Sequence, residues 1–238
     1  MLMNKEHRIL IFGASGGIGS ALIFEAKRRY PKSIIYACSR VALDSSDLQS
    51  FVCDPTDEQS LQWLSESLSD FKFDRIIVAT GILHDGLIKP EKRYSDLSKD
   101  AMLELFSVNT VVPSLIAKYF LPLLQDNNPS VFAALSARVG SISDNRLGGW
   151  YSYRASKAAL NMILKTLSIE MKRRNKQAII LGLHPGTVHT ALSKPYSSNV
   201  KTVFTPEQSA IYLWDVIETR RLSDTGLCFD WKGDKIDF

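Results

Sequence analysis

Short apolar runs alternate with longer amphipathic segments along almost the whole chain. Short runs bounded by polar or glycine residues are typical of buried parallel strands. We predict strands at Arg8–Phe12, Ser33–Cys38, Gln49–Cys53, Asp74–Ala79, Ser130–Ser136, Gln177–Leu183 and Gly226–Trp231. Helical periodicity predicts helices at Ser20–Arg29, from a Thr56 or Asp57 cap to Leu68, at Asp100–Leu124, Ala155–Arg174 and Glu207–Glu218. Strands that alternate with helices predict a single doubly wound, Rossmann-type α/β domain over residues 1–238, with a mostly parallel seven-stranded sheet and helices on both faces.

Two prolines predict where a helix is irregular and where another helix begins. Pro113 lies inside the predicted helix 100–124, so we expect a kink or a local irregularity there. Thr205 and Pro206 form a helix start, with a cap residue followed by proline at the first helical position. The stretch from His84 to Ser98 is polar and predicts a loop.

A glycine-rich stretch, Gly13-Ala-Ser-Gly-Gly-Ile-Gly19, joins the first predicted strand to the first helix. Glycines let a ligand approach the backbone, and a helix N-terminus offers amides and positive potential to a phosphate. The spacing differs from the usual Gly-x-Gly-x-x-Gly fingerprint, so a plain tight turn is the alternative. The position between a strand and a helix favours a nucleotide.

The second predicted strand ends at Ser39 and Arg40. An acidic residue at such a strand end would bind a ribose 2′-hydroxyl, whereas an arginine accommodates a 2′-phosphate. No carboxylate follows before Asp44. The pattern therefore favours NADP over NAD, and the alternative is a solvated loop arginine.

The stretch Trp150 to Asn161 carries the candidate chemistry. Tyr153 and Lys157 are four residues apart, so on a helix they share one face. An ammonium beside a phenol favours the phenolate and lowers its pKa from about 10, which makes the tyrosine a usable proton donor near neutral pH. Because Tyr-x-x-x-Lys also arises by chance, the pair is informative only beside a cofactor site.

Composition and charge exclude several other classes of protein. The 238 residues are 45% hydrophobic and 23% charged with a net charge of +4, which is ordinary for a soluble domain. The sequence has no basic stripe or aromatic platform for nucleic acid, no apolar run near the ~18 residues of a membrane span and no signal-peptide pattern. Three widely spaced cysteines lack metal or disulfide spacing and indicate buried thiols in a reducing compartment. We expect a soluble cytoplasmic protein with no metal site, no nucleic-acid partner and no membrane association.

Taken together, these motifs resemble the short-chain dehydrogenase/reductase family. The resemblance spans nearly the whole chain and rests on an ordered set: Gly13-x-x-x-Gly17-x-Gly19, Asp54, Gly81, Asn109, Tyr153-x-x-x-Lys157 and Pro185-Gly186-x-x-x-Thr190. Within the family, the stretches 81–86, 140–142 and 151–157 are most similar to the C-factor and sniffer-type carbonyl reductases. The resemblance implies the strand order 3-2-1-4-5-6-7 and a homodimer or homotetramer assembled through the two long helices.

The resemblance also implies a role for each matched residue. Tyr153 would protonate the substrate carbonyl, Lys157 would lower the pKa of Tyr153 and hold the ribose, and Asn109 would support a water that relays protons to Lys157. The cofactor would be NADP(H). Its pyrophosphate would be held by Gly13, Ser15, Gly17, Ile18 and Gly19, its adenosine half by Arg40, Asp54 and Gly81, and its nicotinamide by Pro185, Gly186, Val188 and Thr190.

The chain departs from the family pattern at the catalytic serine. The usual serine position, three residues before Gly140, is Ala137. Ser136 or Ser141 would supply the hydroxyl, and we favour Ser136, although a one-residue shift at a strand end turns a side chain to the other face. Further departures are Gly16 in place of a basic residue, Pro55 with no N–H beside the adenine, and Val78-Ala-Thr-Gly81 in place of Asn-Asn-Ala-Gly.

These expectations define a function and an alternative to it. We expect an NADP(H)-dependent reductase of an aldehyde, ketone or quinone, with a short polar substrate loop at about 191–204 and a fairly open site. His84, His184 and His189 lie near the predicted cleft, where we expect them to form hydrogen bonds within loops. The alternative is a non-catalytic dinucleotide-binding sensor or signalling protein of the C-factor type, which would not need the Tyr153 acid.

Overall fold

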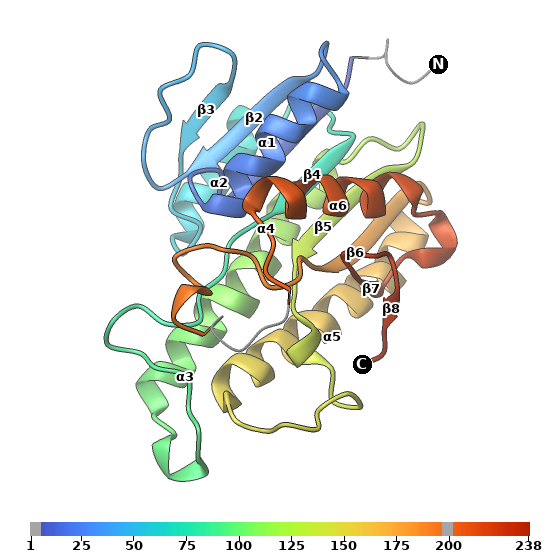
Figure 1. Cartoon of the computed structure of the whole chain (residues 1–238). Coiled ribbons are helices and arrows are strands. Elements are labelled where there is room, and N and C mark those ends of the chain that lie inside the picture. The colour runs from blue at the N-terminus through green and yellow to red at the C-terminus, as the bar shows by residue number, and fades with distance from the viewer. Residues whose placement is uncertain (1–5, 197–201) are drawn as a thin grey trace.

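The computed structural model describes residues 6–196 and 202–238, and its centre is one eight-stranded sheet (Figure 1). The strand order is β3-β2-β1-β4-β5-β6-β7-β8, parallel except for β8. The strands are β1 Arg8–Phe12, β2 Ile34–Ser39, β3 Gln49–Val52, β4 Arg75–Val78, β5 Ser130–Leu135, β6 Ala178–His184, β7 Leu227–Asp230 and β8 Lys235–Ile236. The predicted fold class and the order of the first seven strands are confirmed. The prediction missed β8, a two-residue antiparallel strand at the sheet edge.

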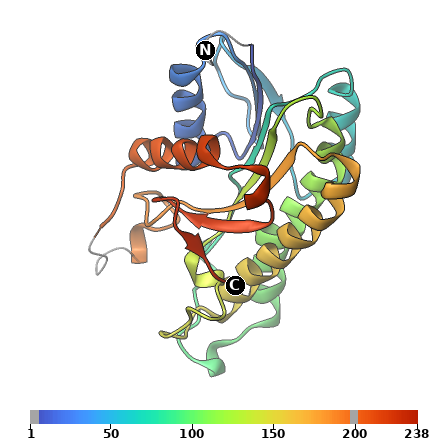
Figure 2. The ribbon, with the colours of Figure 1, turned by 90° about the vertical axis from the view of Figure 1, so that its right-hand side faces the viewer.

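Helices cover both faces of the sheet (Figure 2). The main helices are α1 Gly17–Arg29, α2 Glu58–Ser67, α3 Lys99–Phe106, α4 Val112–Phe120, α5 Tyr151–Arg174 and α6 Pro206–Thr219. One buried apolar cluster joins α1 and α6 to the sheet, and a second joins α2, α4 and α5 to its other face. Strands that are apolar on both faces therefore supply two core layers, as a doubly wound sheet requires.

The strand order reverses next to β1, which pairs with β2 on one side and with β4 on the other. In an open parallel sheet, ligands bind in the crevice beyond the carboxyl ends of the strands at such a switch point. We therefore expect a ligand site at the loops that follow β1, β2 and β4.

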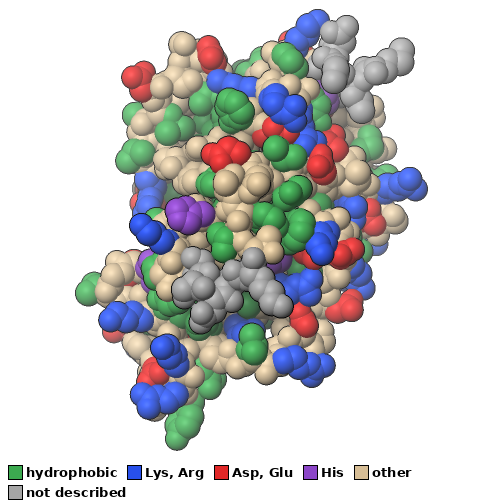
Figure 3. Space-filling view, in the orientation of Figure 1, with side chains coloured by type: hydrophobic (Ala, Val, Ile, Leu, Met, Phe, Trp, Pro, Cys, Tyr) green, Lys and Arg blue, Asp and Glu red, His purple; other side chains and the backbone are tan. Residues whose placement is uncertain are grey.

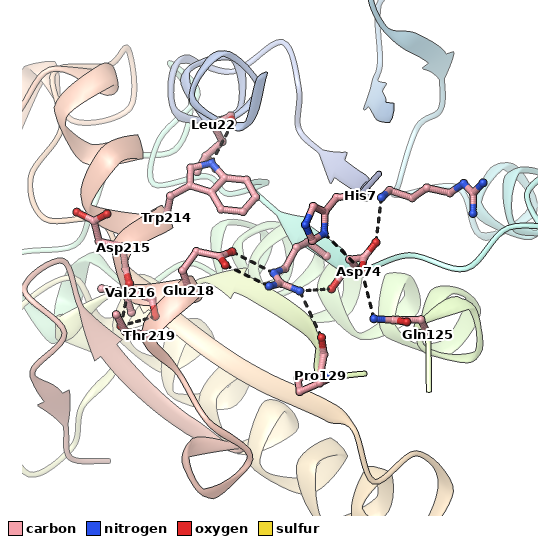
Figure 4. Close-up of polar contacts among 12 residues, drawn as sticks. His7, Leu22, Asp74, Gln125, Pro129, Trp214, Asp215, Val216, Glu218 and Thr219 are labelled. Carbon is pink, nitrogen blue, oxygen red and sulfur yellow. Dashed lines mark hydrogen bonds and ion pairs between the residues drawn. The ribbon is translucent and has the colours of Figure 1, made fainter. Parts of the chain in front are cut away.

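A polar cluster closes the opposite, amino end of the same strands (Figure 4). The Asp74 carboxylate accepts hydrogen bonds from the backbone N–H of Arg8, at 3.0 Å, and from the Gln125 amide, at 3.2 Å. The Arg75 guanidinium donates to both oxygens of Glu218 on α6, at 3.3 Å each. These contacts connect β1 to the start of β4, and β4 to α6. They lie at the end of the strands opposite the candidate site.

The predicted helix at 100–124 is interrupted as Pro113 suggested. Between α3 and α4 the chain forms a π-helical turn at Ser107–Val111, and a 3₁₀ turn follows at Leu121–Leu123. Proline has no N–H and its ring crowds the preceding turn, so the backbone widens just before Pro113. By length and composition alone Lys99–Leu123 resembles a membrane span, but α4 buries Ile116 and Phe120 in the core as a layer of this fold.

Candidate active site

A cavity of about 730 Å³ opens beyond the carboxyl ends of β1, β2 and β4. It is lined by residues of five loops, among them Gly13 and Ser15, Arg40, Asp54 to Thr56, Thr80 to Ile82, and Ala191 and Leu192. The volume suits a ligand of cofactor size. Five of the residues predicted to bind the cofactor therefore face one space: Gly13, Ser15, Arg40, Asp54 and Gly81.

The glycine loop has the geometry of a phosphate cradle. Gly13 has φ of +78°, and a Cβ on Gly19 would lie 2.1 Å from the Gly13 carbonyl oxygen, so neither position tolerates a side chain without a shift. The helix α1 begins at Gly17 with no side-chain cap and no acidic residue in its first turn. Its N-terminal amides and positive potential are thus open to an anion, which fits a dinucleotide pyrophosphate.

The end of the cavity next to β2 and β3 holds one positive and one negative side chain. Arg40 follows β2 directly, and Asp54 lies just beyond β3. The Thr56 backbone and hydroxyl donate hydrogen bonds to Asp54 Oδ1 at 2.9 and 2.7 Å. These two bonds, with a smaller contribution from the charge of Arg40, lower the pKa of Asp54. Both side chains line the cavity, as the predicted roles require, and so does Pro55.

Thr80 and Gly81 line the 730 Å³ cavity, and Gly81 also lies close to Lys157 of the helix α5. A Cβ on Gly81 would lie 3.5 Å from Asn109 Oδ1 and 3.6 Å from Lys157 Nζ. The Thr80 hydroxyl is buried, lines the cavity and has no hydrogen-bond partner among the described residues. A buried hydroxyl without a partner is unusual, so Thr80 is suited to meet a ligand atom.

Tyr153 and Lys157 share one face of α5, as predicted. Lys157 Nζ lies 5.9 Å from the centre of the Tyr153 ring and donates a 2.8 Å hydrogen bond to the Leu135 carbonyl at the end of β5. Burial lowers the pKa of Lys157 to about 8 and raises the pKa of Tyr153 to about 12. The expected lowering of the Tyr153 pKa is therefore wrong for this structure, because the cost of burying a phenolate dominates.

Asn109 lies in the π-helical turn and is fully buried. Its Oδ1 accepts a hydrogen bond from the Ile82 backbone N–H at 2.9 Å, and its Nδ2 donates to the Ile82 carbonyl at 2.8 Å and to the Ser156 hydroxyl at 3.2 Å. The amide thus fastens the loop after β4 to α5. Its predicted support of a water beside Lys157 stays a prediction.

The structure does not place Ser136 at the cavity. Its side chain is 4% exposed and donates a 2.6 Å hydrogen bond to Asn161 Oδ1 on the inner face of α5. Ser141 is also buried, and its oxygen accepts the backbone N–H of Asp144 at 3.1 Å. Our preference for Ser136 is therefore not supported, since the one-residue offset from position 137 turns its hydroxyl into the interior.

The predicted nicotinamide-binding segment lies beside the glycine loop. A Cβ on Gly17 would lie 3.1 Å from the Thr190 methyl carbon, so the two loops touch. Gly186 has φ of +78°, and its missing side chain makes room for the Phe204 ring, which a Cβ would approach to 2.7 Å. Val188 forms an isolated bridge with Phe204, which closes the base of the predicted substrate loop. Thr190 thus lies beside Gly17 of the glycine loop, and none of Pro185, Gly186, Val188 and Thr190 lines the 730 Å³ cavity.

Comparison with known proteins agrees with this geometry. The family model described as short chain dehydrogenase matches residues 7–201. The chain belongs to this family. A relative from Rhodococcus sp. (strain AD45), 1-hydroxy-2-glutathionyl-2-methyl-3-butene dehydrogenase, is 29% identical over 85% of this chain and 86% of its own length. The C-signal of Myxococcus xanthus is 30% identical over 59% of this chain and 81% of its own length.

Solved structures show the same fold at lower identity. The carbonyl reductase Sniffer of D. melanogaster matches with a TM-score of 0.85 at 23% identity, covering 98% of this chain and all of its own. An NADPH-bound carbonyl reductase from chicken fatty liver matches with a TM-score of 0.81 at 23% identity, over 98% of this chain and 100% of that one. The short-chain dehydrogenase fold is therefore shared over essentially the full chain, and the chain is an oxidoreductase of that family.

One residue near the site that the sequence did not indicate is Glu91, which caps the helix α5. It comes from the loop after β4, is 3% exposed, and accepts hydrogen bonds from the Ser152 backbone N–H at 3.3 Å and from the Ser152 hydroxyl. A carboxylate at a helix N-terminus is stabilising. The helix α5 accordingly begins at Tyr151, four residues before the predicted start. No local pattern reveals this contact, because Glu91 precedes the helix by some 60 residues.

The histidines near the site have separate surroundings. His84 Nε2 lies 3.0 Å from the Leu192 carbonyl and so links the loop after β4 to the predicted substrate loop, in line with the expected loop hydrogen bond. His184 has a buried Nδ1 without a partner among the described residues, and burial, followed by the charge of Arg138, lowers its pKa to about 4. No group of three or more metal-ligating side chains occurs within residues 6–196 and 202–238.

Proposed function

We propose that this chain is an NADP(H)-dependent oxidoreductase that reduces an aldehyde, ketone or quinone. The observation that carries the proposal is the approach of Asn109 and Lys157 to Gly81, which lines the 730 Å³ cavity. Tyr153 lies on the same helix face as Lys157. A phosphate cradle at one side and a tyrosine–lysine pair at the other fit hydride transfer to a carbonyl carbon with protonation of its oxygen.

The chain's own groups account for the proton. NADPH, when bound, supplies the hydride. Tyr153 donates its phenolic proton to the carbonyl oxygen, and its pKa of about 12 keeps the phenol protonated at neutral pH. Lys157, with a pKa of about 8, is mostly charged at pH 7 and stabilises the phenolate that remains.

The preference for NADP(H) rests on Arg40. Arg40 lines the cavity. A 2′-phosphate bound there would form charge-assisted hydrogen bonds with its guanidinium. We expect Arg40→Ala to weaken NADPH binding about 10- to 100-fold in a fluorescence titration and to leave NADH binding nearly unchanged. Equal affinity of the unaltered protein for NADPH and NADH would contradict the assignment.

Absorbance at 340 nm tests turnover. With NADPH present, addition of an aldehyde, a diketone or a quinone is expected to cause carbonyl-dependent loss of NADPH absorbance. Cofactor binding without turnover on any of the carbonyls would instead favour the non-catalytic sensor. Two observations keep that second function open: the C-signal relative, and the engagement of both Ser136 and Ser141 in internal hydrogen bonds.

The proposed partners are a small carbonyl substrate and further copies of the same chain. Exposed apolar side chains lie on or beside the two long helical segments: Val111, Met162 and Ile169 are 48%, 66% and 51% exposed. We propose a homodimer or homotetramer through these helices, tested by the mass of the protein in solution before and after Met162→Glu.

On the face drawn in Figure 3, basic and acidic side chains are interspersed, which supports the proposal of no nucleic-acid partner. A cytoplasmic location fits the three buried free thiols.

A further inference from the structure

A row of aromatic rings adjoins the Tyr153 phenol. The Trp150 ring lies edge-to-face with Tyr153, with centres 6.1 Å apart, and with Tyr196 at 5.5 Å. Tyr196 in turn meets the His84 ring at 5.5 Å. The rings come from three separate segments: the loop after β4, the start of α5 and the substrate loop. All four residues are partly exposed, and His84 also lines the 730 Å³ cavity, so the row extends from that cavity to Tyr153.

Trp150 occupies this place with an unfavourable backbone. Its φ is +52° and its ψ is +44°, and it is the only non-glycine residue with positive φ among residues 6–196 and 202–238. Gly148 and Gly149 precede it with φ of +64° and +65°. A left-handed conformation is costly for a bulky residue, and three consecutive left-handed residues form a sharp turn. Glycine would fit position 150 without this cost.

Surrounding contacts hold the turn in place. The Trp150 backbone N–H donates to the Glu91 carbonyl, and the Glu91 carboxylate accepts a hydrogen bond from Ser152 in the first turn of α5. The Arg154 guanidinium donates to the carbonyls of Gly149 and Gly148 at 2.9 and 3.0 Å. A strained residue that is held by several independent contacts beside an active site indicates a function for its side chain.

We infer that Trp150, together with Tyr196, is the wall against which the flat substituent of the substrate lies, and that the preferred substrates are planar, conjugated carbonyl compounds such as aryl ketones and aryl diketones. This inference rests on the proposed function. Indole and phenol rings offer large rigid apolar faces at little cost in side-chain entropy, and aromatic pairs gain further from ring electrostatics. The expectation of an open site overlooked this wall because Trp150 lies outside the predicted substrate loop.

A packing role for Trp150 makes a different prediction. If the ring only anchored Tyr196 and so positioned the substrate loop, its removal would impair every substrate to a similar degree. A wall that contacts the substrate discriminates between substrates that differ only in their flat substituent.

The test compares two diketones, 1-phenyl-1,2-propanedione and 2,3-butanedione, in Trp150→Gly and Trp150→Phe. Glycine keeps the left-handed backbone while removing the ring, and Trp63→Ala is the matched control, because Trp63 is 61% exposed on α2 away from the site. Each variant is first checked for unchanged NADPH affinity. If Trp150→Gly does not fold, Tyr196→Leu takes its place.

We expect kcat/KM for the phenyl substrate to fall about 10- to 100-fold in Trp150→Gly, mainly through KM, and less in Trp150→Phe. The value for 2,3-butanedione should stay within about threefold, and Trp63→Ala should change neither. An equal loss for both substrates, or no loss for either, would overturn the inference while the proposed function stands. If the unaltered protein reduced neither diketone nor any other carbonyl with NADPH, the proposed function itself would fail.

Discussion

Burial of the Lys157 ammonium should cost folding stability, and Lys157→Met should recover part of it. The side chain is 3% exposed, and its pKa falls from 10.5 to about 8. A shift of this size corresponds to about 3 kcal/mol. The substitution also removes the hydrogen bond to the Leu135 carbonyl, which is worth about 1 kcal/mol. The net expectation at pH 7 is a gain of about 2 kcal/mol, or about 4–8 °C in Tm for a chain of this length.

The stability gained by Lys157→Met should depend on pH, in a direction set by the pKa of Lys157 in the folded and unfolded states. Below pH 8 both states carry the proton, so the folded state bears the whole cost of burying the charge. Between pH 8 and about 10.5 the folded state releases a proton that the unfolded state keeps, and stability rises with pH. Above this range both forms are neutral and the cost is gone. The advantage of Lys157→Met should therefore be largest below pH 8 and should shrink toward pH 10.5.

Chemical unfolding in urea from pH 6 to pH 10 measures both quantities. Lys172→Met is the control, because Lys172 is an exposed lysine in the last turn of the same helix. It should shift the free energy of unfolding by no more than about 0.5 kcal/mol at any pH. A Lys157→Met protein that is less stable than the parent at pH 7, or whose difference from the parent does not vary with pH, would refute the reasoning.

Two further predictions concern residues away from the catalytic pair. Trp214→Phe should lower the free energy of unfolding by about 2 kcal/mol, measured in urea, because Trp214 is fully buried and its Nε1 donates to the Leu22 carbonyl at 3.0 Å; an unchanged midpoint would count against this. His184 stays neutral in the folded state down to about pH 4, so the parent should lose stability as pH falls from 6.5 to 4. His184→Asn should lose less over that range, and parallel pH curves for the two proteins would contradict the assignment.

The layout of the fold was accessible from the sequence because local pattern and global topology agree. Continuous apolar runs such as Arg8–Phe12 can only be buried strands here, and Pro113 marked the irregular turn correctly. The strand β8 was missed because two residues, Lys235 and Ile236, show no period of their own. The early start of α5 was missed because a distant carboxylate, Glu91, makes it possible.

The candidate site was accessible in part. The Tyr153–Lys157 spacing predicts a shared face, but it carries no information on burial, which sets both pKa values. The direction of the Ser136 hydroxyl depends on a one-residue offset at the end of β5 and on the partner Asn161, which only the structure supplies. Trp150 had no recognisable signal, because its left-handed backbone and its ring contacts come from three loops that meet only in the folded chain.

The most direct test of the central claim is a comparison of Tyr153→Phe with the parent protein in NADPH-dependent carbonyl reduction. Loss of the phenolic oxygen removes the proposed acid and leaves the ring in place, so NADPH affinity should be unchanged while turnover falls by at least about 100-fold. Trp63→Ala, assayed beside it, should keep full activity. Carbonyl reduction by Tyr153→Phe at the parent rate would contradict the account.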